Sequence, residues 1–204
     1  MKLHDLTCRT RHVLPLLGAG LLLFISASLA RADIIPEVST ITPHGSNFTW
    51  SYTASLTNDE TLQSGNFFTI YDFAGYVSGT NFQPANWVFS SANVGKTPSR
   101  VTPTDNPSIP NLTWTYTGPN VGPGPVDLGL FGADSTFSNE KLGSFAAEAI
   151  KYAPGKPGNG KPVDNVGSAG VPTGHNNVIP ETSSLLLLLP GLAPLGMLLR
   201  RRRA

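Results

Sequence analysis

Apolar and polar residues alternate along the middle of this chain in the pattern that β-strands show. The clearest run is residues 47–56, where one side of the predicted strand is apolar and the other carries Asn, Ser and Thr. The apolar positions are Phe48, Trp50, Tyr52, Ala54 and Leu56. Residues 112–117 alternate in the same way. Alternation with a period of two is typical of a half-buried antiparallel strand. Both segments contain Thr-Trp-x-Tyr-Thr, which suggests that the two strands pair or descend from a weak duplication.

Further strands are predicted at 67–77, 87–91, 126–131 and 143–152, with turn-forming Gly, Pro and Asn at the joins. Several short strands separated by such turns favour a β-sandwich. The fold prediction is therefore all-β: a single antiparallel β-sandwich domain over residues 33–152. The alanines of 144–152 leave a helix open as the alternative for that segment, and we predict a strand.

The three tryptophans, Trp50, Trp87 and Trp114, each lie on an apolar strand face. Burying a large apolar side chain is worth roughly 1.5–3 kcal/mol, so we expect these residues to anchor the core. The alternative is that tryptophan or tyrosine on an exposed sheet face stacks against sugar rings. That alternative would make the domain a carbohydrate-binding surface module.

A segment rich in glycine and proline follows the predicted domain. Residues 153–178 contain six glycines and four prolines and no aromatic residue. Such a composition buries too little apolar surface to order itself. We therefore predict a flexible linker over 153–178, with an average end-to-end distance of roughly 25–30 Å.

The C-terminal segment, 179–204, combines a short polar motif, an apolar run and a basic end. The apolar run, 185–199, would span roughly 22 Å as a helix, against about 30 Å for a bilayer core. It is interrupted by two prolines and two glycines. Arg200, Arg201, Arg202 and Arg203 follow it and should stay on the cytoplasmic side of the membrane. We predict a short transmembrane helix at 185–199 that serves as a weak, temporary anchor.

This arrangement resembles the PEP-CTERM sorting signal of Gram-negative bacteria. Pro180 and Glu181 match the first two motif positions, and Thr182 stands where a second proline is usual. The resemblance implies a non-enzymatic exported protein that is processed by an exosortase-like enzyme and occurs with exopolysaccharide or biofilm matrix. It implies a location at the inner membrane first, and then at the cell surface or in the extracellular matrix. Segments 66–75 and 111–118 also look like domains of other PEP-CTERM proteins, and they imply no activity.

Two other interpretations of the tail stay open. Residues 179–183 are close to the Leu-Pro-x-Thr-Gly signal of sortases, except that Ser183 replaces the glycine. Alternatively, the tail is a plain membrane anchor that no enzyme cuts. These interpretations differ in whether, and where, the chain is cleaved.

The N-terminal segment, 1–32, has the three parts of a signal peptide. Basic residues precede an apolar run at 13–29, and small residues end it. Ala30 and Ala32 fit the A-x-A pattern of signal peptidase, which leaves Asp33 as the first mature residue. A cut after Ala30 is the second choice. The only cysteine, Cys8, lies in this segment, so the mature chain has no disulfide.

The charge of the mature part excludes one class of partner. Residues 33–182 contain six basic and twelve acidic residues, a net charge of −6. This acidic body carries no basic cluster for nucleic acid.

The sequence offers few candidate catalytic residues. The two mature histidines are His44, in an apparent turn, and His175, in the predicted linker. A polar cluster around His44, or a pair among Asp59, Asp72, Asp127 and Asp134, would be needed for an envelope hydrolase. Asp59, Glu60 and Asp105 lack the spacing of a calcium loop. We therefore expect no metal, no cofactor and no catalytic residue.

Overall fold

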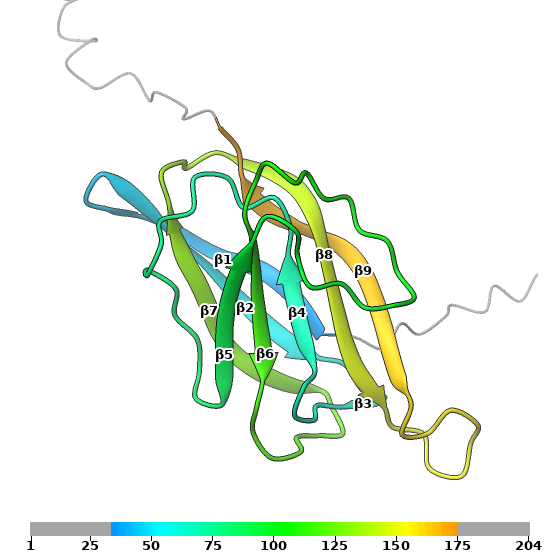
Figure 1. The fold of residues 1–204 in the computed structure, drawn as a ribbon. Helices are drawn as coiled ribbons and strands as arrows, with labels where there is room; N and C mark the ends of the chain where they lie inside the picture. The colour runs from blue at the N-terminus through cyan, green and yellow to red at the C-terminus, as the bar shows by residue number, and fades with distance from the viewer. Residues whose placement is uncertain (1–33, 175–204) are drawn as a thin grey trace, which may run out of the picture. The chain divides into compact units, whose positions relative to one another are not determined.

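A computed structural model describes residues 34–174, which form an all-β core of two antiparallel sheets, consistent with a β-sandwich (Figure 1). The three-stranded sheet has the order β1-β2-β7 and consists of β1 (Ile34–His44), β2 (Asn47–Leu56) and β7 (Val126–Ser135). The six-stranded sheet consists of β3 (Glu60–Thr61), β4 (Phe67–Ile70), β5 (Trp87–Ala92), β6 (Asn111–Tyr116), β8 (Glu140–Lys151) and β9 (Pro162–Pro172).

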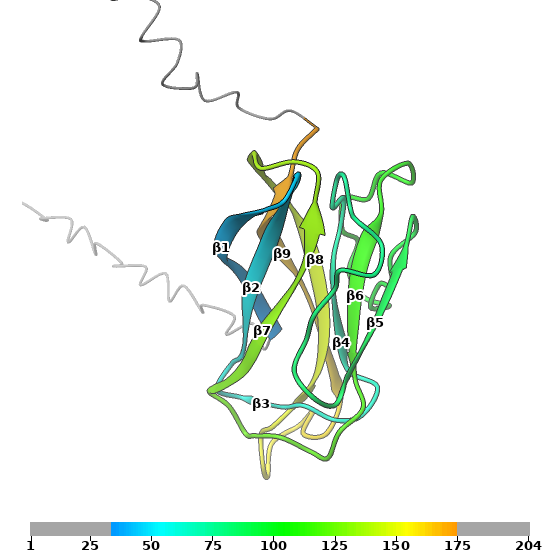
Figure 2. The same ribbon diagram turned by 90° about the vertical axis from the view of Figure 1, so that its left-hand side faces the viewer.

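In the six-stranded sheet β5, β6, β4 and β8 are neighbours in that order. Strand β9 pairs along β8, and the short β3 pairs with the C-terminal end of β8. Figure 2 shows β1, β2 and β7 in one layer and β4, β5 and β6 in the other. The core lies between the two layers.

The alternation in the sequence predicted β2 well. Its bounds are those expected, and Trp50, Tyr52, Ala54 and Leu56 are buried while Thr53 and Ser55 are exposed. The other predicted strands are also present with shifted ends. Residues 144–151 belong to strand β8, so the helix alternative for 144–152 was wrong.

One predicted strand was too long and one predicted pairing was wrong. The strand expected over 67–77 ends at Ile70, because the backbone turns at Asp72, whose φ of 57° is left-handed. The two Thr-Trp-x-Tyr-Thr strands do not pair: β2 pairs with β1 and β7, whereas β6 pairs with β4 and β5 in the other sheet. Trp50 and Trp114 nevertheless belong to the same hydrophobic core.

Aromatic side chains fill the space between the sheets. Trp50 and Trp114 are fully buried and Trp87 is 7% exposed, so the core interpretation of the tryptophans is confirmed. Phe131 of β7 contacts the rings of Phe68, Trp87 and Trp114, with centroids 4.9–5.9 Å apart. Edge-to-face geometry of this kind adds about 0.5–1.5 kcal/mol per pair beyond burial. No tryptophan is therefore available as a sugar-stacking platform.

The largest correction concerns the predicted linker, 153–178. Residues 162–172 form β9, which pairs with β8 from Pro162↔Ile150 to Pro172↔Glu140. Val171 is fully buried and belongs to the core. The composition of 153–178 was therefore a wrong guide over 162–172, and the domain extends beyond residue 152.

Strand β9 is ordered because its neighbours supply the apolar surface that it lacks. Gly167 lies under the ring of Phe145, where a Cβ atom would approach the ring at 2.5 Å. The hydroxyl of Tyr52, from the other sheet, donates to the carbonyl oxygen of Gly170 at 2.9 Å. A strand of small residues therefore fits beneath larger side chains, and the backbone ladder with β8 satisfies its polar groups.

Candidate functional site

A long segment between β5 and β6 crosses the outer face of the six-stranded sheet, visible as the green loop in front of β8 and β9 in Figure 1. We call this segment, residues 93–110, the strap. Its contacts run from β4 through β8 to β9, so it spans half of the sheet. The strap has no regular secondary structure apart from turns, and side chains of the sheet hold it in place.

Arg100 ties the strap to β9. Its backbone N–H donates to Asp164 Oδ2 at 2.9 Å, and its guanidinium donates to both carboxylate oxygens, at 3.1 and 3.0 Å. The guanidinium also donates to the carbonyl oxygen of Pro162. These hydrogen bonds lower the pKa of Asp164 below its usual value and raise the pKa of Arg100. This pair is a bidentate fork that fixes the middle of the strap.

Lys96 and its neighbours tie the start of the strap to β4. The Lys96 Nζ lies 3.8 Å from the centroid of the Phe67 ring. The Lys96 carbonyl accepts hydrogen bonds from Thr69 Oγ1 at 2.7 Å and from the Tyr71 hydroxyl at 2.9 Å. Partial burial lowers the pKa of Lys96, and burial raises the pKa of Tyr71. The strap thus covers a polar row of the outer face that would otherwise meet water.

Asp72 holds the end of the strap. The amide of Asn106 donates to Asp72 Oδ1 at 2.8 Å, and the Asp72 amide donates to Asn111 Oδ1 at 2.8 Å. Asn111 Nδ2 donates in turn to Asp105 Oδ1 at 2.9 Å. Asp tolerates positive φ better than most residues, so the Asp72 backbone can make the turn after β4. Its side chain is then free to anchor the strap.

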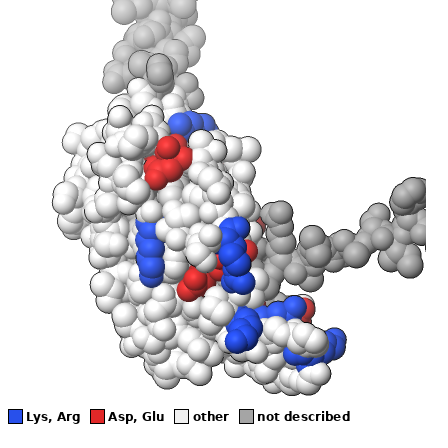
Figure 3. Space-filling view, turned by 45° about the vertical axis from the view of Figure 1, so that its right-hand side comes forward, with Lys and Arg blue, Asp and Glu red and all other residues white. Residues whose placement is uncertain are grey.

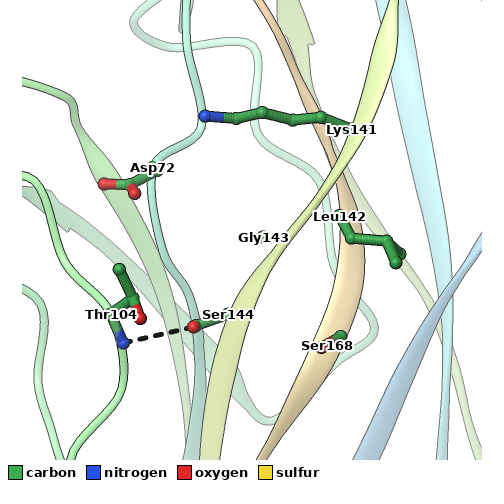
Figure 4. A pocket seen from close by; sticks show the side chains of 7 residues that line it. All are labelled: Asp72, Thr104, Lys141, Leu142, Gly143, Ser144 and Ser168. Atoms are coloured by element: carbon green, nitrogen blue, oxygen red, sulfur yellow. Dashed lines mark hydrogen bonds between the residues drawn. The ribbon is translucent and has the colours of Figure 1, made fainter.

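A hollow of about 250 Å³ lies between the end of the strap and strands β8 and β9. Its lining is mostly polar and consists of Asp72, Thr104, Lys141, Leu142, Gly143, Ser144 and Ser168. Figure 4 shows Lys141 reaching across the hollow from β8 toward the segment that carries Asp72. The Thr104 amide donates to Ser144 Oγ at 3.2 Å, which closes one side of the hollow.

Charges on this face are mixed. Figure 3 shows basic and acidic side chains in small separate groups, with no broad patch of one sign.

His44 has a partner that the sequence did not reveal. It ends β1, where the sequence suggested a turn, and its Nδ1 lies 2.7 Å from Asp134 Oδ2. Asp134 Oδ1 accepts from Thr49 Oγ1 at 2.6 Å. The His44 side chain is 71% exposed, and among residues 34–174 its hydrogen bond runs only to Asp134. The contact orients the imidazole, but it places no hydroxyl nucleophile on the outer ring nitrogen.

The other predicted residues are placed as follows. Asp59 and Glu60 lie near the C-terminal end of β8, whereas Asp105 lies near its other half, so the calcium candidates are apart. Within residues 34–174 no group of three or more His, Asp or Glu side chains is placed to hold a metal ion.

The targeting residues fall elsewhere. Outside the described residues lie Ala30, Ala32, His175, Pro180, Glu181, Thr182 and Arg200 to Arg203. The predicted transmembrane segment, 185–199, lies there too; in the described part, 34–174, no helix is long and apolar enough to cross a membrane.

Sequence reasoning missed the hollow and the strap. Asp72 was considered only as one of several carboxylates, and Lys141, Ser144 and Ser168 were not singled out. No local pattern joins residues so far apart in the chain. The one usable signal was the long stretch without alternation at 93–110, which is too long for a simple hairpin connection.

The fold and this site define an all-β protein whose polar hollow is built by a strap on the outer face of its larger sheet. Comparison with protein-family models, with curated proteins and with solved structures finds no match for the chain.

Proposed function

We propose that this chain is an exported, non-enzymatic protein of the cell envelope or extracellular matrix. Its two sheets form one β-sandwich domain, which a C-terminal sorting tail holds at the inner membrane until an exosortase-like enzyme cuts the tail. Signal peptidase removes residues 1–32 during export. The cut domain then works at the cell surface or in the matrix, in contact with exopolysaccharide.

The observation that carries this proposal is the order of segments after the domain. Pro180, Glu181 and Thr182 are followed by the apolar run and then by Arg200 to Arg203. An apolar run of this length is short for a permanent anchor, and the arginines would keep the terminus on the cytoplasmic side. A tail that anchors weakly and carries a sorting motif suits a protein that is held at the membrane only until the tail is cut.

Strand β9 changes the spacing between domain and motif. The strand ends at Pro172, and the Thr173 amide still donates to the Asn139 carbonyl at 2.8 Å. Only five residues separate Gly174 from Pro180, so their Cα atoms lie at most about 22 Å apart. A processing enzyme would therefore act close beside a folded domain.

The polar groups of the domain also support a role without catalysis. Asp134 accepts a hydrogen bond from Thr49 in the hairpin of β1 and β2. Asp164 and Asp105 accept hydrogen bonds that hold the strap. Carboxylates engaged in holding loops suit a rigid binding or structural module.

The test is the intact mass of the protein purified from its native host. We expect a mature chain that begins at Asp33 and has lost the residues beyond the motif. Pro180→Ala combined with Glu181→Ala should leave the tail uncut, whereas Glu37→Ala, an exposed change on β1, should be processed normally. A cut after Thr182 would support the sortase interpretation. An uncut tail in the unaltered chain would refute the proposal in favour of a plain anchor.

An envelope hydrolase is the second candidate, favoured by the 2.7 Å contact between His44 and Asp134. An aspartate that orients an imidazole is one part of a general base. If the domain is a hydrolase, a host that carries His44→Ala should show the same phenotype as a host that lacks the protein. If the first proposal is right, that host should behave as the unaltered one does.

A further inference from the structure

The hollow contains two opposite charges that do not neutralise each other directly. Among residues 34–174, the ion pairs within 4.0 Å are His44–Asp134 and Arg100–Asp164, so Lys141 and Asp72 form none. Asp72 Oδ1 accepts from the Asn106 amide, and no described residue donates to Oδ2. A carboxylate oxygen and an ammonium group therefore remain available to a ligand between them.

The hydroxyl groups of the hollow add both donors and acceptors. Ser168 lies on β9 and Ser144 on β8. The Ser144 oxygen accepts from the Thr104 amide, and no described residue accepts the Ser144 hydroxyl hydrogen, which therefore remains available to a ligand. A lysine only donates, an ionised aspartate only accepts, and a serine does both. A ligand rich in hydroxyl groups, each of which donates and accepts, matches this mixture.

An apolar side chain completes the lining. Leu142 is 78% exposed, although it is large and lies on a strand. Sugar rings have C–H faces as well as hydroxyl edges, so one ring can pack against Leu142 while its hydroxyls meet the polar groups. A free amino acid would match the two charges but would leave much of the lining unused.

The size and rigidity of the hollow fit one ring. A volume of about 250 Å³ corresponds to about eight water molecules, which is near the size of one hexose unit. The strap is fixed on both sides of the hollow by the Thr104–Ser144 and Asn106–Asp72 hydrogen bonds. Such prior fixation reduces the entropy cost of binding. The balanced charges favour a neutral ligand over an acidic or basic one.

From these contacts we infer that the hollow binds one sugar residue of a neutral polysaccharide. The sugar hydroxyls contact Asp72, Lys141 and Ser168, and the ring packs on Leu142. This assignment rests on the proposed function and deepens it, because it locates the contact with exopolysaccharide in the hollow. Sugar binding is measured whether or not the tail is processed, so failure of this assignment and failure of the proposed sorting can be told apart.

The test uses the purified full chain in detergent and three neutral probes: the tetrasaccharides of β-1,4-glucose, α-1,4-glucose and β-1,4-mannose. Isothermal titration calorimetry should give a dissociation constant of about 1 mM or tighter for at least one probe. Lys141→Ala should weaken binding about tenfold or more, since it removes a charged donor. Asp72→Asn should do the same while keeping an oxygen for the Asn106 amide and a residue that tolerates positive φ.

Lys156→Ala is the matched control, because it removes an exposed lysine from the turn between β8 and β9 and should leave binding unchanged. Circular dichroism checks that each variant is folded, and Lys141 is exposed enough that its replacement should not unfold the domain. The inference is overturned if none of the probes binds at about 10 mM, or if Lys141→Ala binds as the unaltered chain does. It is also overturned if glycine or a polyuronate displaces the bound probe at equal concentration.

Discussion

Replacing Val171 with alanine tests whether β9 is part of the folded domain. Val171 is fully buried, in a segment whose composition predicted a flexible linker. The change removes two methyl groups, worth about 0.8 kcal/mol each, and leaves a cavity that adds to the cost. We expect a loss of about 2–3 kcal/mol in the free energy of unfolding. That loss is large against the 5–15 kcal/mol typical of a domain.

Urea unfolding followed by tryptophan fluorescence measures this loss. The three tryptophans are buried, so their emission should shift when the core opens. With a urea dependence of about 2 kcal/mol per molar, the midpoint should fall by about 1 M. Val94→Ala is the matched control, because Val94 is 72% exposed on the strap and should change stability little. Equal midpoints for Val171→Ala and the unaltered chain would refute the assignment of β9 to the core.

Three further changes probe the strap, the packing within the three-stranded sheet and the contact between the sheets. Arg100→Ala should lower the urea midpoint at pH 7. Because the folded pKa of Asp164 is depressed, the difference should disappear as pH falls below about 4, and a difference unchanged at acid pH would contradict the pair. Gly132→Ala should destabilise the domain strongly in the same assay, since its Cβ would lie 2.1 Å from the Trp50 carbonyl oxygen. Tyr52→Phe should cost about 1–3 kcal/mol in urea unfolding, because a buried β9 carbonyl loses its donor.

Alternation predicted the strands in which burial follows the residue pattern. In β2 every second residue faces the core, and Trp50 and Tyr52 made that face unmistakable. Strand β6 shows the same signal around Trp114. In such strands the segment's own apolar side chains are the ones that become buried, so the local sequence is enough to predict the strand and its buried face.

Strand β1 lacked such a signal. Pro36 and Pro43 weaken a strand pattern, because proline cannot donate to a ladder. The structure tolerates both, since β1 is the edge of its sheet and, among the strands of residues 34–174, pairs only with β2. A bulge between Val38 and Thr40 shifts the register as well. The edge position in the sheet, which cannot be seen in the local sequence, allows β1 to form a strand despite its two prolines.

The hollow could not be predicted for a related reason. Asp72 and Lys141 lie far apart in the chain, and they line the same hollow because the turn after β4 lies beside the start of β8. The Tyr71 amide donates to the Ser144 carbonyl at 3.0 Å, which fixes this approach. Only the pairing of β4 with β8 places a charge of each sign beside the same cavity.

Strand β9 links the fold to the proposed sorting. In the proposed sorting, a flexible linker of 26 residues would let the domain move freely relative to a membrane-held tail. With β9 folded, the spacer between Gly174 and Pro180 is only five residues long. Under the proposed sorting, a processing enzyme would have to accommodate the end of the domain where β9 leaves β8. Under the same proposal, the short spacer would tie cleavage to the folded state. If β9 detached, about ten more residues of chain would join the spacer, and the approach of an enzyme to the motif would change.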